Sequence, residues 1–249
     1  MSAPLPKPQA SRCPFTVSTA SEANEVFRNR QFQLPNIAPY LEQLQTASGK
    51  DLSCMIKVAH SSFMFQPAAE HQKLRGSVAR FFRSASLAQW APQIDQAIAE
   101  SLDRLQDSEA PDLVRDVTDP LFVSLVQKIL GLRVADETAF VKHCIDARGI
   151  LEPLLPLRRI MQVQDAFRGI MASVPDASRY PISPEEGPAP LSQVLCDEAH
   201  LLPMHTDRKA LVAFLSVSFH AVAESLALIL LNTLQESRAS WCDMAAPDT

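Results

Sequence analysis

The feature that most restricts the fold is a stretch near the carboxyl-terminal end, from Asp207 to about Gln235, which is nearly all apolar. It is also the longest helical segment that the sequence predicts. A helix that is apolar on every side has to lie in the middle of a protein, enclosed by other elements. We therefore expect the remaining helices to pack around this one.

Glycine and proline usage indicates that those other elements are helices too. The chain has only six glycines in 249 residues, against an average usage of about 7%, and strand-and-turn folds need glycine at their bends. Its nineteen prolines predict stiff, extended connections between helices. We expect a mainly α fold that is large enough to bury a sizeable core.

Charge and targeting signals exclude several classes of function. The net charge is −5, and the longest basic groups are pairs such as Arg158–Arg159, whereas binding to nucleic acid needs a clustered basic surface. The first dozen residues lack the apolar core of a signal peptide. The long apolar helix carries His220 and Glu224, so we expect no membrane span. These observations predict a cytoplasmic protein that binds neither nucleic acid nor membrane.

The cysteines predict neither a disulfide framework nor a metal site. They are odd in number and widely scattered, at Cys13, Cys54, Cys144, Cys196 and Cys242. This distribution suits reduced thiols in a cytoplasm. No two are spaced as a zinc site would need, and we expect no bound metal.

Hydrophobic periodicity divides the chain into one helical domain with two loose ends. We expect a loose segment over residues 1–14, a single domain over 15–236 and a tail over 237–249. Within the domain, Pro14–Ser18 is predicted as a short strand, and the helices are predicted over 21–28, 37–45, 71–82, 87–105, 112–130, 136–149, 157–173, 191–199 and 207–235. In the 87–105 helix, one face carries Trp90, Ile94, Ile98, Leu102 and Leu105, and we expect this face to be buried.

The helix after Pro111 has clear start and stop signals. Asp112 takes the N-cap position, and Gly131 is the expected terminator. Pro120 lies inside and is expected to kink or split the helix. Asp112, Asp116 and Asp119 could suggest a metal-binding acid cluster, but their position near a helix start explains them better, since acids there oppose the helix dipole.

The segment Pro67–Arg75, PAAEHQKLR, followed by Val78 and Phe81-Phe82, resembles the cytochrome P450 signature of a proline-rich turn and Glu-His-x-x-Leu-Arg opening a helix. In that family the His and the Arg point at the haem propionates, roles that would fall here to His71 and Arg75. Residues four apart lie on one helical face, which such pairing requires.

The resemblance extends over roughly residues 14–235. Phe15–Val17 with Glu22–Phe32 is similar to the family's strand and short helix, and Ala110–Leu132 is similar to a later helix. The long apolar helix then resembles the central helix that crosses the haem. There, Ala221-Val222-Ala223-Glu224-Ser225 matches the Ala-Gly-x-acid-Thr oxygen-activation motif.

Two departures from the family argue against a self-sufficient monooxygenase. The family's Glu-x-x-Arg helix and its glycine-rich cysteine loop come after the central helix, and no glycine follows Gly187 here. Cys242 is therefore expected to be an idle thiol. Val222 replaces the glycine that leaves room for dioxygen, and a β-branched side chain would fill that space. We expect a truncated, haem-less P450-like fold without a cofactor.

Two interpretations of the polar residues on the central helix stay open. His220 and Glu224 face the same way, and with Ser225 they could act as acid, base and alcohol in a vacated pocket lined by Ala221, Val222 and Val217. A desolvated Glu would then have a raised pKa. Alternatively, Glu224 and Ser225 are relics held by a buried hydrogen bond, and His220 is a core residue with a partner.

The same choice applies to His71 and Arg75. They could meet an anionic ligand, or they could pair with local acids such as Glu70. Without an iron ligand, we favour the structural interpretation. His200 and His205 lack a third ligand at metal spacing and are expected to be exposed.

Three functions follow from the resemblance. The first is a haem-free binding or helper protein of natural-product metabolism, which takes up a hydrophobic small molecule or a partner enzyme and forms an oligomer. The second is a cofactor-independent cyclase or isomerase of a terpenoid or polyketide-like substrate, using Glu224, Ser225 and His220 for proton transfer. The third is half of a split or degraded monooxygenase.

Overall fold

The computed structural model describes residues 17–29, 36–106, 108–152, 155–176 and 187–244. For residues 236–244 it describes the backbone only. The chain forms two compact units, Met1–Pro35 and Asn36–Thr249. In the first, helix α1 (Ala20–Arg28) begins with a capping box, in which Thr19 and Glu22 each accept a backbone hydrogen bond from the other. This helix confirms the prediction for residues 21–28. The predicted loose segment 1–14 and most of the predicted strand lie outside the described residues, and Val17 and Ser18 are not in a strand.

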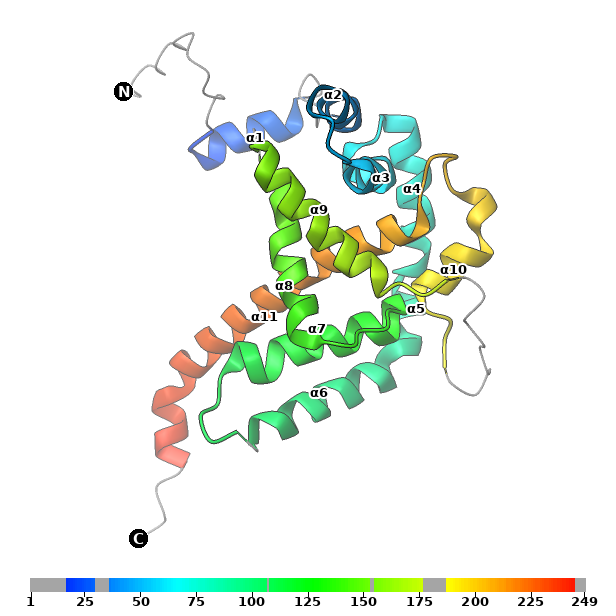
Figure 1. Cartoon of the computed structure of the whole chain (residues 1–249). Helices are drawn as coiled ribbons and strands as arrows, with labels where there is room; N and C mark the ends of the chain where they lie inside the picture. The colour runs from blue at the N-terminus through cyan, green and yellow to red at the C-terminus, as the bar shows by residue number, and fades with distance from the viewer. Residues whose placement is uncertain (1–16, 30–35, 107, 153–154, 177–186, 245–249) are drawn as a thin grey trace. The chain divides into compact units, whose positions relative to one another are not determined.

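The described residues of the second unit form helices joined by loops and turns, and none of them is in a strand (Figure 1). Its α-helices are α2 (Ala38–Ser48), α3 (Ser53–Ser61), α4 (Ala68–Phe81), α5 (Ser84–Leu87), α6 (Ala91–Gln106), α7 (Asp119–Leu125), α8 (Glu137–Ala147), α9 (Leu157–Ala172), α10 (Leu191–Asp197) and α11 (Arg208–Met244). Shorter helical turns occur at Phe63–Phe65, Ala88–Trp90, Leu113–Thr118, Val126–Leu130, Arg148–Leu151 and Ala199–Leu201. The mainly α prediction is confirmed, while α3 was not predicted.

The first half of α11 is the centre of this unit. Residues 210–217 are all buried, and α11 contacts α3, α8, α9 and α10. In Figure 1, α8 and α9 cross in front of α11, which runs diagonally behind them. The long apolar helix is therefore central, as the sequence predicted.

The second half of α11 is not enclosed by the described residues. Ala223 is its last core residue, and beyond it the side chains of Leu228 and Ile229 are 62% and 61% exposed. The helix also continues to Met244, past residue 237, where the tail was expected to begin. The expectation of burial on all sides thus holds for only one half of this helix.

Helix α6 buries a different face from the predicted one. Trp90, in the turn just before α6, is buried, but Ile98 and Leu102 are 40% and 48% exposed. The buried positions in the middle of the helix are Ala97 and Ser101, on the side that contacts α7 and the turn before it. Small side chains allow close packing, so the helix turns these inward and leaves part of its apolar stripe outside.

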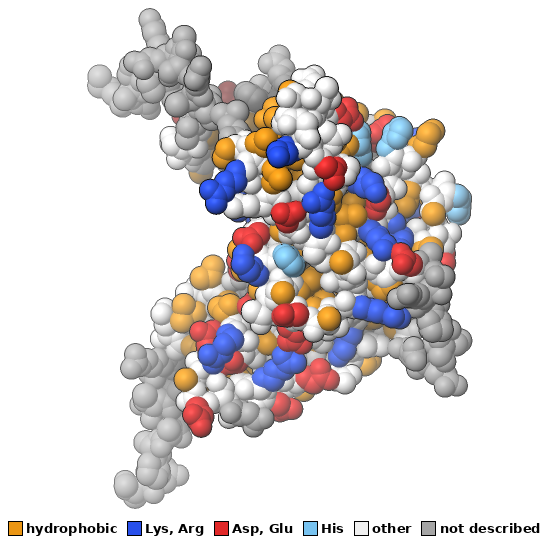
Figure 2. All heavy atoms as spheres, viewed as in Figure 1, with side chains coloured by type: hydrophobic (Ala, Val, Ile, Leu, Met, Phe, Trp, Pro, Cys, Tyr) orange, Lys and Arg blue, Asp and Glu red, His pale blue; other side chains and the backbone are white. Residues whose placement is uncertain are grey.

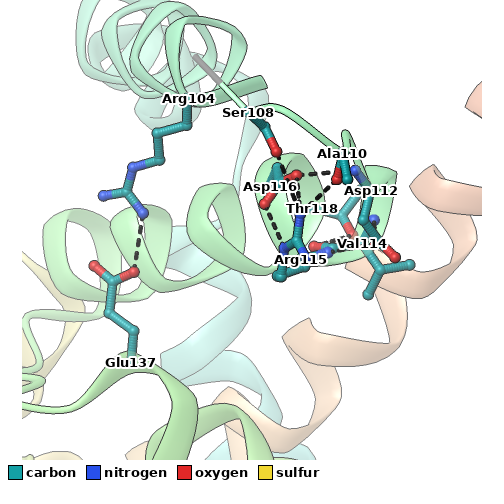
Figure 3. A network of polar contacts seen from close by, with 9 residues as sticks. All are labelled: Arg104, Ser108, Ala110, Asp112, Val114, Arg115, Asp116, Thr118 and Glu137. Carbon is teal, nitrogen blue, oxygen red and sulfur yellow. Dashed lines mark hydrogen bonds and ion pairs between the residues drawn. The ribbon is translucent and has the colours of Figure 1, made fainter. Parts of the chain in front are cut away.

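The start of the segment leading into α7 confirms the interpretation of Asp112 as an N-cap (Figure 3). Its Oδ1 accepts hydrogen bonds from the backbone N–H groups of Val114 and Arg115, both at 2.9 Å. Asp116 accepts one from the Asp112 backbone N–H at 2.9 Å. The Arg115 guanidinium donates to both Asp116 oxygens at 2.7 Å and, with that backbone bond, holds the pKa of Asp116 well below its usual range. These two acids therefore stabilise a helix start, and neither needs a metal.

This segment ends at Gly131, as predicted. It is divided into a π-helical turn, α7 and a second π-helical turn, with Pro120 in the first turn of α7. Gly131 has a φ of 79°, a left-handed conformation that favours glycine. A Cβ there would collide with Ser192 and Pro190, so the same glycine also permits the close approach of α10.

We predict that Asp112→Ala lowers the free energy of unfolding by about 1 kcal/mol, because two backbone donors lose their acceptor. Asp112→Asn retains an acceptor oxygen and is the matched control, with a loss of only a few tenths of a kcal/mol. Urea denaturation followed by circular dichroism measures both. Equal losses for the two variants would contradict the capping role.

Candidate functional site

Four polar side chains from three parts of the unit meet beside the middle of α11. We call Asp119, Arg148, His220 and Glu224 the polar cluster. His220 and Glu224 are one turn apart on α11, Asp119 begins α7, and Arg148 begins the turn after α8. The sequence singled out the two α11 residues, but it did not indicate Arg148, which lies 72 and 76 positions away.

Arg148 holds this cluster together. Its guanidinium donates one hydrogen bond to Glu224 Oε2 at 2.6 Å and another to His220 Nδ1. Because a guanidinium has no acceptor, Nδ1 must be the unprotonated nitrogen, which places the imidazole proton on Nε2. Nε2 lies 3.6 Å from Asp119 Oδ1, too far for a good hydrogen bond. The buried Nε2 is otherwise without a hydrogen-bond partner among the described residues.

The two predicted α11 residues have different surroundings. His220 is only 2% exposed, and its ring meets the edge of Phe122 at a centroid distance of 4.9 Å. The Glu224 side chain is 51% exposed and ion-paired. The burial expected for Glu224 is therefore absent from the structure, because this carboxylate reaches solvent and a cation. An acid–base role for these residues stays a prediction.

The other residues of the predicted pocket differ in their exposure. Ser225 is exposed and donates its hydroxyl hydrogen bond to the Ala221 carbonyl at 2.9 Å, one turn back in its own helix. Val217 is buried in the core, whereas Val222 is 67% exposed. Ala221 is exposed as well. Val217 lies in the enclosed half of α11, whereas Ala221, Val222 and Ser225 lie where the enclosure ends.

His71 and Arg75 also have surroundings that differ from the expected local pairing. His71 donates from Nδ1 to the Phe63 carbonyl at 2.8 Å and not to Glu70. Its ring lies edge-on to Phe63 at 6.0 Å. Arg75 is exposed. The half-buried His71 thus has a structural partner, while its Nε2 is left as an acceptor.

The described cysteines do not fit the axial thiolate that haem in this fold family would require. Cys54 and Cys144 are buried, and burial raises the pKa of their thiols to about 11 and about 12. A thiol protonated at neutral pH is a poor metal ligand. Cys196 is half-buried on α10. No group of three metal-ligating side chains occurs in the described parts of the chain.

A surface cavity that the sequence did not indicate lies between α3, α9 and the start of α11. Its volume is about 290 Å³, and its lining includes Cys54, Lys57, Arg168, Met171 and Lys209. Each of the three cations is already paired with an aspartate. The distances are 3.8 Å for Lys57 with Asp207, 2.9 Å for Arg168 with Asp51 and 2.7 Å for Lys209 with Asp176. The cavity therefore offers no uncompensated positive charge to an anion.

One helix of the described chain is long and apolar enough to cross a membrane, the stretch Arg208–Gln235 of α11. Only 33% of its most apolar window is buried. A helix that is buried in a protein core can have the same length and composition, and residues 210–217 in the first half of α11 are buried by other helices. The absence of a membrane span stays a prediction.

Known structures identify the fold of this chain. The structure of CalO2 matches with a TM-score of 0.61 and 22% identity over 82% of this chain and 50% of that one. P450BioI, solved in complex with an acyl carrier protein carrying hexadec-9Z-enoic acid, matches with a TM-score of 0.68 and 13% identity over 89% of this chain and 56% of that one. Epothilone D-bound cytochrome P450epoK matches with a TM-score of 0.62 and 18% identity over 90% of this chain and 56% of that one.

The fold is that of a cytochrome P450, as the sequence resemblance predicted, and the chain spans about half the length of these structures. Among curated proteins, nocardicin C N-oxygenase from Nocardia uniformis subsp. tsuyamanensis is 31% identical over 80 residues, which are 32% of this chain and 20% of that protein. No family model matches the chain.

We predict that Arg148→Met lowers the free energy of unfolding by about 1–3 kcal/mol, because it leaves buried His220 without its donor and Glu224 without its cation. The matched control is Arg104→Met, which breaks the exposed 3.0 Å ion pair with Glu137 shown in Figure 3 and should cost less than about 1 kcal/mol. Urea denaturation measures both. Losses of equal size would show that the polar cluster stabilises the fold no more than a surface ion pair does.

Proposed function

We propose that this chain is a P450-derived binding protein of natural-product metabolism, which engages a hydrophobic metabolite or a partner enzyme and is not a monooxygenase by itself. The observation that carries the proposal is the uncovered second half of α11. Its exposed large apolar side chains are Val222, Leu228, Ile229, Leu231 and Leu234. Figure 2 shows hydrophobic side chains gathered over this part of the unit.

This surface favours binding because exposed apolar area has a cost in water. Burying one Leu or Ile side chain fully contributes about 1.5–3 kcal/mol, so several together provide a strong driving force for association. Contiguous apolar patches on soluble proteins usually mark sites of interaction. In the compared fold, P450BioI is seen with an acyl carrier protein, which supports the idea that such a chain works with a protein partner.

The surroundings of α11 support a role that does not depend on haem in this chain. Val222 stands where the resemblance expects glycine, and the two buried thiols stay protonated at neutral pH. His71, which the resemblance assigns to a haem carboxylate, already donates to a backbone carbonyl. We therefore assign no chemical step to a haem group.

The metabolic setting rests on the relatives. Nocardicin C N-oxygenase and the epothilone-bound cytochrome P450epoK are named for secondary metabolites. A role in the same kind of metabolism, in the cytoplasm, is consistent with the composition of the chain. The metabolite or partner of this chain is not defined by those names.

The haem-free proposal predicts that the purified chain, mixed with haem, dithionite and carbon monoxide, gives no thiolate-type band in its visible spectrum. The physical reason is that burial keeps the thiols of Cys54 and Cys144 protonated at neutral pH. Haem mixed with bovine serum albumin is the control for adventitious binding. A carbon-monoxide band of the thiolate type would contradict the proposal and favour half of a split monooxygenase.

A second candidate function is a cofactor-independent cyclase or isomerase. The observation that favours it is the buried His220, whose protonated Nε2 points towards Asp119 while Nδ1 contacts Arg148 beside Glu224. Such a row of groups can hold and move a proton.

Glu224→Gln separates the two functions. If the chain is a binding protein, this variant keeps its binding partner or metabolite with less than about a threefold change in affinity, because the amide still accepts from Arg148. If the chain is an enzyme using Glu224, turnover falls about 100-fold or more. Glu152→Gln, at an exposed ion pair with Arg159, is the matched control.

A further inference from the structure

His220 is a buried histidine whose two ring nitrogens face charged side chains. The residue is only 2% exposed. Arg148, from the turn after α8, donates a hydrogen bond to its Nδ1. Glu224 Oε1, one turn further along α11, lies 3.9 Å from Nδ1, and Asp119 Oδ1 of α7 lies 3.6 Å from Nε2. A change of charge on this ring therefore acts on three parts of the fold.

We propose that His220 is a pH-sensitive switch, which holds the turn Arg148–Leu151 against α11 while its imidazole is neutral and releases the turn when the imidazole is protonated. Histidine is the side chain whose ordinary pKa places its change of charge between about pH 5 and pH 8. Such a switch acts alike in a binding protein and in an enzyme, so it goes beyond the proposed function.

In the neutral state, Arg148 connects the turn after α8 to two residues of α11. Its guanidinium donates one hydrogen bond to His220 Nδ1 and another to Glu224 Oε2. Gly149 and Ile150, which follow Arg148, are buried, so this contact fixes a turn that belongs to the core. The hydrogen bond to His220 requires an unprotonated Nδ1, because a guanidinium can only donate.

Protonation of His220 removes the acceptor on which this contact depends. Both ring nitrogens of an imidazolium are donors, so the Arg148 guanidinium would face another donor and a second positive charge. Like charges at hydrogen-bond distance repel each other, and buried charges are screened much less than exposed ones. The hydrogen bond between Arg148 and His220 is therefore lost in the protonated state.

Arg148 is the partner that can move when this hydrogen bond is lost. Asp119 and Glu224 lie slightly beyond hydrogen-bond length from the two ring nitrogens, so a small shift gives the imidazolium an acceptor on each side within the core. The Arg148 side chain is 29% exposed, against 2% for that of His220. The guanidinium can thus turn into water, and its departure loosens the turn Arg148–Leu151 from α11.

Other titratable side chains do not give the same response. Cys144 of α8 interacts electrostatically with Arg148, but burial raises the pKa of its thiol to about 12, and the thiol stays protonated between pH 5 and pH 8. His60 Nε2 lies 3.4 Å from Glu42 Oε1, so protonation of His60 strengthens that contact. His220 differs because the group that donates to its ring is a cation.

The test follows the folded chain by NMR from about pH 8 to about pH 5.5, a range in which carboxylates are ordinarily ionised. The nitrogen chemical shift of His220 Nδ1 should be that of an unprotonated nitrogen at the upper pH, and both ring nitrogens should be protonated at the lower pH. Protection of the backbone amides of residues 148–151 against hydrogen exchange, corrected for the intrinsic effect of pH, should fall at least about tenfold, because the turn loses a hydrogen bond from a charged group.

His220→Asn is the variant that tests the role of the imidazole. The amide oxygen of Asn can accept from Arg148 in place of Nδ1 but does not titrate, so the protection of residues 148–151 should differ by less than about twofold between the two pH values. His60→Asn is the matched control, since it removes another histidine that lies beside a carboxylate, and it should keep the full response. Circular dichroism checks that both variants fold.

A response to pH that persists in His220→Asn would overturn the inference. So would an Nδ1 that is already protonated at the upper pH, or a ring that stays neutral at the lower one. An imidazolium that forms without any loss of protection in residues 148–151 would overturn it as well. If His220→Asn does not fold, the nitrogen shifts and amide protection of the unmodified chain decide the question by themselves.

Discussion

Burial of the first half of α11 is the constraint on which the rest of the second unit depends. Residues 210–217 are buried, and α11 contacts α3, α8, α9 and α10. Each of them presents an apolar face because α11 has apolar side chains on every side to cover. The position of α11 therefore decides where the shorter helices lie and which of their faces are buried.

The polar cluster marks the point where this enclosure ends. Arg148 connects the end of α8 to His220 and Glu224, and the last core residue of α11, Ala223, lies between those two. On one side of the cluster α11 is covered by its own chain, and on the other it is open to solvent. Ion pairing with Arg148 stabilises Glu224 at this boundary, where neither full hydration nor full burial is available.

The comparisons and the geometry agree on a fold and leave the chemistry to proposal. About half of a P450 structure is matched, and the residues at the positions of the oxygen-activation motif point in different directions. Ala223 packs in the core and Val222 faces solvent. A surface for association is therefore better supported by the described residues than an enclosed site around Glu224.

Most of the fold could be predicted from the sequence, because periodicity, caps and breakers are local signals. The central helix, the N-cap at Asp112 and the stop at Gly131 all follow from residues within a few positions of one another. The candidate site could be predicted only in part. His220 and Glu224 share a helical face, but Arg148 reaches them only through the packing of α8 against α11, and nothing near Arg148 in the sequence indicates that contact. Likewise, the composition of α11 determined that it must be enclosed, whereas tertiary structure alone decided which half the chain encloses, because burial depends on the neighbours that packing brings to each turn.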